Sequence, residues 1–219
     1  MIFAKIDFIN LLPFHVFIKK NLRSTQAKQI INYKKSYPSL INKQFKKRKV
    51  DAAVISSIAS RSCKKEQCLD LGIVAHGVVD SVLVKPGIYK KDFQSDTSNA
   101  LAKVLKIEGE VIIGDKALYE FYNSDEEFID LATKWQEQYN LPFVFARLCV
   151  NKDKKYLTQL SKQFLQNKVY IPQYILEQYS KRSGLSKNQI KNYLTKIHYK
   201  IGAKEKKSLK LFLRLSRKK

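Results

Sequence analysis

Small polar side chains open a helix at four places where an apolar, strand-like segment ends. They stand at Asn10, at Ser56 and Ser57, at Thr97 and Ser98, and at Gly114-Asp115. In α/β sheets, ligands bind beyond the carboxyl ends of the strands, where such turns gather. Helix N-termini offer unpaired N–H groups and the positive end of a dipole, and Ser, Thr and Asn add hydrogen-bonding groups. The pattern therefore predicts a site for carboxylates or phosphates.

Two residues near this pattern need separate treatment. The charge of Asp115 would repel an anion, so we expect Asp115 to cap its helix instead. Ser81 lies inside the predicted strand over residues 78–84, where a serine either contacts the ligand or fills a small space. Each of the other Ser, Thr and Asn residues is a common helix cap when taken alone. Only their recurrence at several strand ends favours a binding site.

The sequence contains none of the short motifs of familiar catalytic devices. It lacks a G-x-S-x-G elbow, a P-loop, a G-x-G-x-x-G turn, a C-x-x-C pair and an H-E-x-x-H helix. The cysteines, Cys63, Cys68 and Cys149, match no zinc-binding spacing and predict free thiols. The three histidines are scattered and lie near no carboxylate cluster. We therefore expect no metal site.

The composition describes a folded chain with a strong positive charge. Its 219 residues are 44% apolar, which is enough to bury a core. There are 42 lysines and arginines against 19 aspartates and glutamates, a formal net charge of +23 that attracts nucleic acids and small dianions. The lysines are spread over nearly every segment without a nucleic-acid-binding signature. We therefore interpret the charge as a solvated surface and expect no nucleic-acid partner.

The sequence also predicts a soluble, cytoplasmic protein that does not bind a membrane. Lys5, Asp7 and Asn10 interrupt the apolar start of the chain, so the continuous core of a signal peptide is missing. No later stretch approaches the ~20 apolar residues that span a bilayer.

Predicted strands and helices alternate along the chain. Apolar runs typical of strands occupy residues 2–8, 29–33, 50–55, 69–75, 78–84, 110–113 and 141–150. Helical patterns follow most of them, and three further helices are predicted over residues 155–166, 172–180 and 186–197. Capping boxes at Ser124 with Glu127 and at Ser186 with Gln189 predict two helix starts. Such alternation is typical of α/β layers with largely parallel sheets.

Two blocks of this alternation, one before Lys85 and one after Asp96, predict two lobes. The polar stretch that ends at Asp96 is the expected first crossover between them, and the last helices are expected to return to the first lobe. The predicted division is 1–85 with 173–219 for one lobe and 86–172 for the other. The residues alone thus describe a two-lobed α/β binder of small anions.

Six segments resemble, in the same order, the motifs of the chorismate dehydratase family of the futalosine route to menaquinone. They are KIDFINLLPF (5–14), KVDAAVISS (49–57), LDLGIVAHGVVDSVLV (69–84), SDTS (95–98), IGDKAL (113–118) and DLATKWQEQYNLPFVFA (130–146). The resemblance implies a fold like that of type II periplasmic binding proteins, with the ligand cleft between two α/β lobes. It also implies a cofactor-free enzyme that converts chorismate, a small dianion, to 3-[(1-carboxyvinyl)oxy]benzoate and water.

The same resemblance implies roles for the polar residues. By motif match, Asn10 and Ser81 are catalytic, with Asn10 near the reacting centre and Ser81 on a substrate carboxylate. The remaining substrate-binding residues are then Ser56, Ser57, Thr97 and Ser98. No general base is assigned, because the Asn10 amide has no suitable pKa. A carboxylate of the substrate is one candidate proton acceptor, and His76 is another.

Three alternatives stay open at this point. The sister enzyme dihydroxynaphthoate synthase shares the fold. That enzyme has a PxPLG-like segment where this chain has LPFVFA, and this chain has no histidine between His76 and His198. A non-catalytic small-anion-binding protein would use the same cleft, and a nucleic-acid binder would use the charge.

Two features depart from the family pattern. The connection over residues 84–95 is short, and Arg147 replaces an aromatic residue. The oligomeric state, monomer or homodimer, is not predicted.

Overall fold

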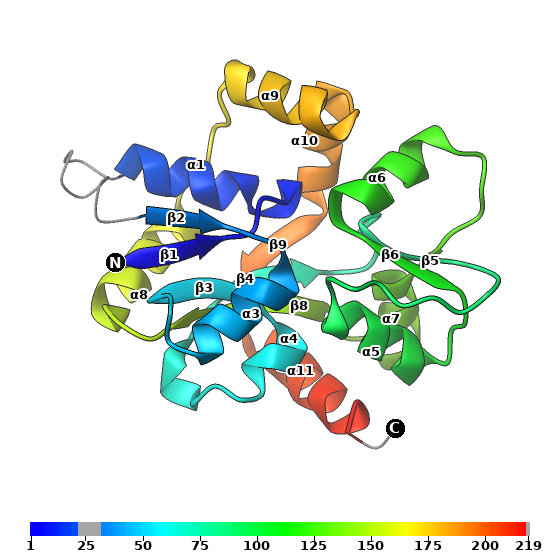
Figure 1. Cartoon of the computed structure of the whole chain (residues 1–219), viewed down its shortest axis with the longest axis horizontal. Coiled ribbons are helices and arrows are strands. Elements are labelled where there is room, and N and C mark those ends of the chain that lie inside the picture. Colours follow the sequence, from blue (N-terminus) through cyan, green and yellow to red (C-terminus); the bar gives the residue numbers. More distant parts are fainter. Residues whose placement is uncertain (22–31, 218–219) are drawn as a thin grey trace.

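The structure is a computed structural model that describes residues 1–21 and 32–217. Its described strands form two sheets (Figure 1). The larger sheet has the strand order β2-β1-β3-β8-β4-β9. Its strands are β1 (Ile2–Lys5), β2 (Asn32–Lys35), β3 (Ala52–Ser56), β4 (Cys68–Ala75), β8 (Phe143–Val150) and β9 (Ile197–Lys200).

The smaller sheet comes from one continuous part of the chain, drawn mostly in green beside the large sheet in Figure 1. Its strand order is β6-β5-β7. The strands are β5 (Val82–Lys85), β6 (Glu110–Ile113) and β7 (Ile129–Asp130), and the helices of this part are α5 (Asp96–Leu105), α6 (Gly114–Asn123) and α7 (Leu131–Tyr139).

Helices from both ends of the chain surround the large sheet. Two of them, α1 and α8, pack together, while α11 packs against β8 and close to α4 and α5. Figure 1 shows α9 and α10 on the same side of the molecule as α1. Their bounds are α1 (Leu12–Asn21), α3 (Pro38–Lys46), α4 (Ser57–Ser60), α8 (Lys154–Gln166), α9 (Gln173–Ser183), α10 (Lys187–Thr195) and α11 (Ala203–Leu215). Within the described residues, no helix is long and apolar enough to cross a membrane.

The large sheet is mixed and the small sheet is antiparallel, so the prediction of largely parallel sheets is wrong. β1 pairs in parallel with β2 and β3, whereas β8 runs antiparallel to β3 and β4, and β9 runs antiparallel to β4. Both pairings of β5 are antiparallel. An apolar run indicates a strand but not its direction, which the connections between strands decide. β9 is missing from the prediction because one helical pattern covers both α10 and the start of β9.

Other predicted elements have mixed outcomes. The strand at 110–113 is confirmed, and so is the capping box at Ser186. The box at Ser124 is wrong, because Ser124 ends α6 and the carboxylate of Asp130 caps α7. The strand predicted over 78–84 begins only at Val82, because Asp80 has a left-handed backbone with φ of 58°. Of the strand predicted over 29–33, residues 29–31 lie outside the described part.

Aromatic side chains pack together where α7, β8 and α11 meet. The ring of Trp135 lies edge-on to Phe143 and Phe212, with centroids 5.2 and 5.9 Å apart. All three are buried, and they belong to one core cluster that continues through both sheets. β8 pairs with β3 and β4 in the large sheet, although its residues fall in the range predicted for the second lobe. The lobe boundaries themselves stay a prediction.

Candidate active site

A cavity lined by residues from both sheets brings five of the six predicted site residues together. Asn10, Ser56, Ser81, Thr97 and Ser98 all line it, around a small cavity volume of about 70 Å³. Most of the other lining side chains are apolar, among them Ile6, Phe8, Leu11, Val54, Ile73 and Phe145.

Asn10 lies within a short 3-10 turn, Ile9–Leu11, and not at a helix cap as predicted. The carboxylate of Asp115 accepts a hydrogen bond from the Ile9 N–H at 3.0 Å. From β9, the hydroxyl of Tyr199 donates to the Asn10 carbonyl at 2.7 Å. Because these contacts fix the backbone of the turn, they hold the Asn10 side chain at the cavity wall.

Ser81 directly precedes β5, and its side chain accepts a hydrogen bond from a residue of α10. The Tyr193 hydroxyl donates to Ser81 Oγ at 3.0 Å, and the Asn10 side chain lies close enough to act on the pKa of this phenol. One buried phenol thus lies beside both residues that the resemblance implies to be catalytic. Burial raises the pKa of Tyr193, so its hydroxyl stays protonated and remains a hydrogen-bond donor.

The backbone before Ser81 is held by Asp130. One oxygen of this carboxylate accepts from the N–H groups of Val79 and Asp80 at 2.9 and 2.7 Å. The other accepts from two N–H groups in the first turn of α7, at 2.9 and 3.0 Å. The buried Asp80 itself pairs with Lys196 at the end of α10. Asp130 therefore ties the start of α7 to the turn that presents Ser81.

Ser56, Thr97 and Ser98 gather where α4 meets α5. Ser56 caps α4, because its Oγ accepts from an N–H in the first turn of that helix at 3.4 Å. The Thr97 hydroxyl accepts from the Ile58 N–H at 3.1 Å, so the two helices are bonded to each other. Thr97 and Ser98 do not cap α5 as predicted, because Ser95 Oγ accepts from the Ser98 N–H at 3.1 Å.

Ser57 and Asp115 turn away from this cavity. The Ser57 hydroxyl donates to the Val144 carbonyl of β8 at 2.5 Å, and its side chain is fully buried. Asp115 does not cap α6 as predicted, since it bonds Ile9 and pairs with Arg182 Nη2 at 2.6 Å. Burial raises the pKa of Asp115. Ser57 thus has a packing contact, and Asp115 supports the turn of Asn10.

The cavity wall offers hydrogen-bonding groups without charge. Among the described residues that line it, none is Asp, Glu, Lys, Arg or His. Gly114 begins α6, and Thr97 and Ser98 lie in the first turn of α5, so two helix N-termini reach the cavity. These ends carry the positive side of the helix dipole. The arrangement suits a small anion held by neutral donors between apolar walls.

A family model described as menaquinone biosynthesis matches residues 88–218, more than half of the chain. The chain belongs to the menaquinone biosynthesis family. A protein named chorismate dehydratase, from Campylobacter jejuni subsp. jejuni serotype O:23/36 (strain 81-176), is 49% identical to it over 217 residues, 98% of this chain and 96% of the relative. These similarities confirm the resemblance seen in the sequence motifs.

Solved structures place this member of the menaquinone biosynthesis family in the periplasmic-binding-protein fold, as predicted. A protein of Archaeoglobus fulgidus matches with a TM-score of 0.73 at 14% identity, covering 99% of this chain and 96% of its own. A Candida albicans protein described as having the generic periplasmic binding protein fold matches with a TM-score of 0.53 at 13% identity, covering 100% and 93%. At such identities the likeness concerns the fold alone.

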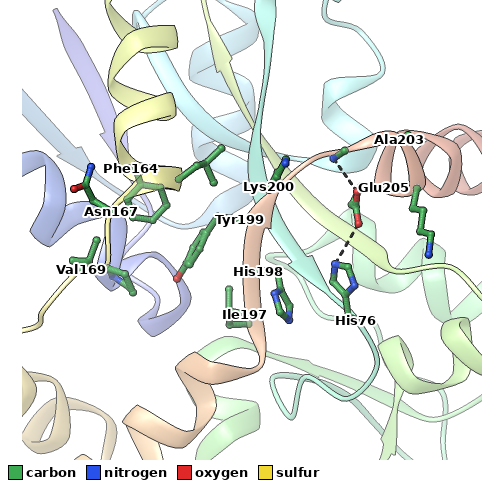
Figure 2. A pocket seen from close by; sticks show the side chains of 14 residues that line it. His76, Phe164, Asn167, Val169, Ile197, His198, Tyr199, Lys200, Ala203 and Glu205 are labelled. Carbon is green, nitrogen blue, oxygen red and sulfur yellow. Dashed lines mark hydrogen bonds and ion pairs between the residues drawn. The ribbon is translucent and has the colours of Figure 1, made fainter.

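Two of the three histidines, His76 and His198, line a different pocket. Figure 2 shows His76, His198 and Glu205 together beside β9. Nε2 of His76 is 3.2 Å from Oε1 of Glu205, and the centroids of the two imidazole rings are 4.5 Å apart. Neither histidine lines the cavity that contains Asn10. The geometry therefore does not support His76 as the proton acceptor.

Three residues that position the site were missed in the sequence. Tyr193 comes from a helix near the C-terminus, Tyr199 from the unpredicted strand β9, and Asp130 from the start of α7. Tyr193 looks like an ordinary core residue, because it lies on the apolar face of α10. For Asp130 a signal was present, since an Asp directly before a helical pattern is a strong cap.

Proposed function

We propose that this chain is a chorismate dehydratase of menaquinone biosynthesis, which converts chorismate to 3-[(1-carboxyvinyl)oxy]benzoate and water. The observation that carries the proposal is 49% identity, over nearly the whole of both chains, to a protein of that name. The cavity supports it, because five polar residues expected from the family motifs line one space. We also propose that the enzyme works in the cytoplasm.

The reaction breaks the C–H bond at ring carbon C3 and the C–O bond at C4. The electron pair of the C–H bond becomes the new ring double bond, and the C4 hydroxyl leaves and takes up a proton as water. Because the product ring is aromatic, much of the driving force is intrinsic to the substrate. The protein has mainly to orient the ring and to hold the two carboxylates.

In this proposal Asn10 contacts the reacting centre and Ser81 binds one carboxylate. Ser56, Thr97 and Ser98, together with the N-termini of α5 and α6, bind the other. Apolar walls exclude water, which strengthens each of these hydrogen bonds. The charge of +23 on the whole chain attracts a dianionic substrate before it enters the cavity.

The proton acceptor in this proposal is a carboxylate of the substrate itself. The described residues lining the cavity include no side chain that could act as a base near neutral pH. The phenol that lies beside both catalytic residues belongs to Tyr193, whose raised pKa keeps it protonated. An elimination within the bound substrate therefore needs positioning and hydrogen bonds from the protein, and no protein base.

The test is to incubate the purified chain with chorismate alone and to follow the products by chromatography and mass spectrometry. We expect the dehydrated aromatic ether without added metal or nucleotide. Asn10→Ala should lower turnover and keep the circular dichroism spectrum, whereas the surface variant Asn123→Ala should keep both. Tight binding of chorismate without conversion would favour a binding protein or the sister reaction, and normal turnover by Asn10→Ala would remove Asn10 from the mechanism.

A further inference from the structure

The three cysteines of the chain meet beside the β4–β8 pair, although they are far apart in the sequence. Cys63 follows α4, Cys68 begins β4 and Cys149 lies in β8. Their Sγ atoms all lie within 4.8 Å of one another, and all three are free thiols. Cys68 and Cys149 are direct cross-strand partners, with their sulfur atoms 3.0 Å apart. The spacing in the sequence does not predict this convergence.

Three thiolates at these separations match the first coordination shell of one metal ion. Sulfur ligands at about 2.3 Å from a common ion lie ~4 Å from one another, so small side-chain rotations would place all three on the same ion. The cluster contains no carboxylate or histidine. Thiolate ligands select soft ions such as zinc and monovalent copper over magnesium and calcium.

Arg147 supplies a charge that fits such a complex. It lies two residues before Cys149 on β8, so the two side chains leave the same face of the strand. Its positive charge acts on both Cys63 and Cys68. Within the described part of the chain, its buried Nε has no hydrogen-bond partner. Three thiolates around a monovalent or divalent ion leave a net negative charge, which this guanidinium offsets.

An ion can reach the cluster from the surface. Cys63 is only partly buried and lines an open pocket together with Ser62, Lys64 and Gln67. A fourth ligand, such as a water molecule, can bind from the same side. Neither Cys68 nor Cys149 lines this pocket, so Cys63 is the outermost ligand.

We propose that Cys63, Cys68 and Cys149 bind one soft, thiophilic metal ion as three thiolates, with Arg147 offsetting the charge of the complex. Binding releases the thiol protons and involves no oxidation. The proposal is independent of the dehydratase activity, because none of the three cysteines lines the cavity of Asn10 and Ser81.

The experiment is a titration of the reduced, metal-free full chain with Cd²⁺, in which binding is measured from the ultraviolet charge-transfer band of cadmium thiolates. Competition with Zn²⁺ and with Cu⁺ is measured afterwards. We expect one ion per chain. Loss of a residue that supports a metal ligand from outside the coordination shell weakens metal binding ~10–100-fold. Cys63→Ser removes a ligand itself and should weaken binding by more than this. His76→Ala is the matched control, because it removes a donor of the separate His76–Glu205 pair, and it should leave the cadmium band unchanged.

A second measurement on the unmodified sequence covers the case in which serine variants fail to fold. Alkylation of the thiols, mapped by mass spectrometry, should be slowed by Cd²⁺ at all three cysteines together. Protection of fewer than three, a missing charge-transfer band, or a Cys68–Cys149 disulfide in protein kept under reductant would each overturn the proposal.

Discussion

The hydroxyl of Tyr193 donates to Ser81 Oγ at 3.0 Å across 112 residues of sequence. Tyr193 lies on α10, beyond β8 in the chain, whereas Ser81 introduces the first strand of the small sheet. The Asn10 side chain lies close enough to the same phenol to act on its pKa. A helix near the C-terminus therefore places one hydroxyl beside both residues proposed to be catalytic.

Tyr193→Phe should lower kcat about fivefold and change KM little. The variant keeps the ring in the core but leaves Ser81 without the bond that orients it, a loss of about 1 kcal/mol. A merely structural role would lower thermal stability without this split between kcat and KM. Tyr174→Phe, at a side chain that is 63% exposed, is the control and should match the unmodified enzyme in steady-state kinetics.

Ser81→Ala should reduce kcat/KM for chorismate by about 10–150-fold. A hydrogen bond to a charged group contributes about 1.5–3 kcal/mol, and each 1.36 kcal/mol corresponds to a factor of ten. Ser57→Ala is the matched comparison. It should cost about 1–3 kcal/mol of unfolding free energy, because the buried Val144 carbonyl loses its donor, and it should keep KM. Equal effects of the two variants on KM would show that both serines bind substrate.

Asp130→Ala should destabilise the fold and impair catalysis together. The change removes the cap of α7 and the acceptor for the N–H groups of Val79 and Asp80, which costs about 2–5 kcal/mol. The turn before Ser81 then loses its support. Urea unfolding and turnover would be measured beside Asp125→Ala, an exposed Asp that precedes the same helix. A stable variant with full activity would refute the role given to Asp130.

The strand-end residues could be picked out in the sequence because their chemistry is local, and their role in binding substrate stays a prediction. Ser56 ends a buried strand and caps the next helix, and both features can be predicted from a few neighbouring residues. Asn10, Thr97 and Ser98 have different local contacts from those predicted, yet they still line the cavity. They meet because residues of both sheets line the same cavity.

The supporting residues could not be predicted in the same way, because their partners are distant in the sequence. Tyr193 and Tyr199 read as core aromatics until the fold brings them to Ser81 and Asn10. The antiparallel course of β8 was equally hidden, since a strand pattern is the same in either direction. It is this course that places Cys149 opposite Cys68.

The histidine pair predicts a loss of stability on mild acidification. Burial, and then the neighbouring His76, lower the pKa of His198 below its ordinary value of 6.5. As the pH falls below 6.5, the unfolded chain binds the proton before the folded chain does, so the free energy of unfolding decreases until the folded imidazole also titrates. Above 6.5 the group is neutral in both states and contributes no such change.

His198→Gln should therefore show a smaller drop in thermal midpoint than the unmodified protein between about pH 7.5 and about pH 5. The variant should keep its turnover at neutral pH, because His198 is outside the cavity. An equal drop in both proteins would mean that other groups cause the acid sensitivity, and lost turnover would return the histidines to the mechanism.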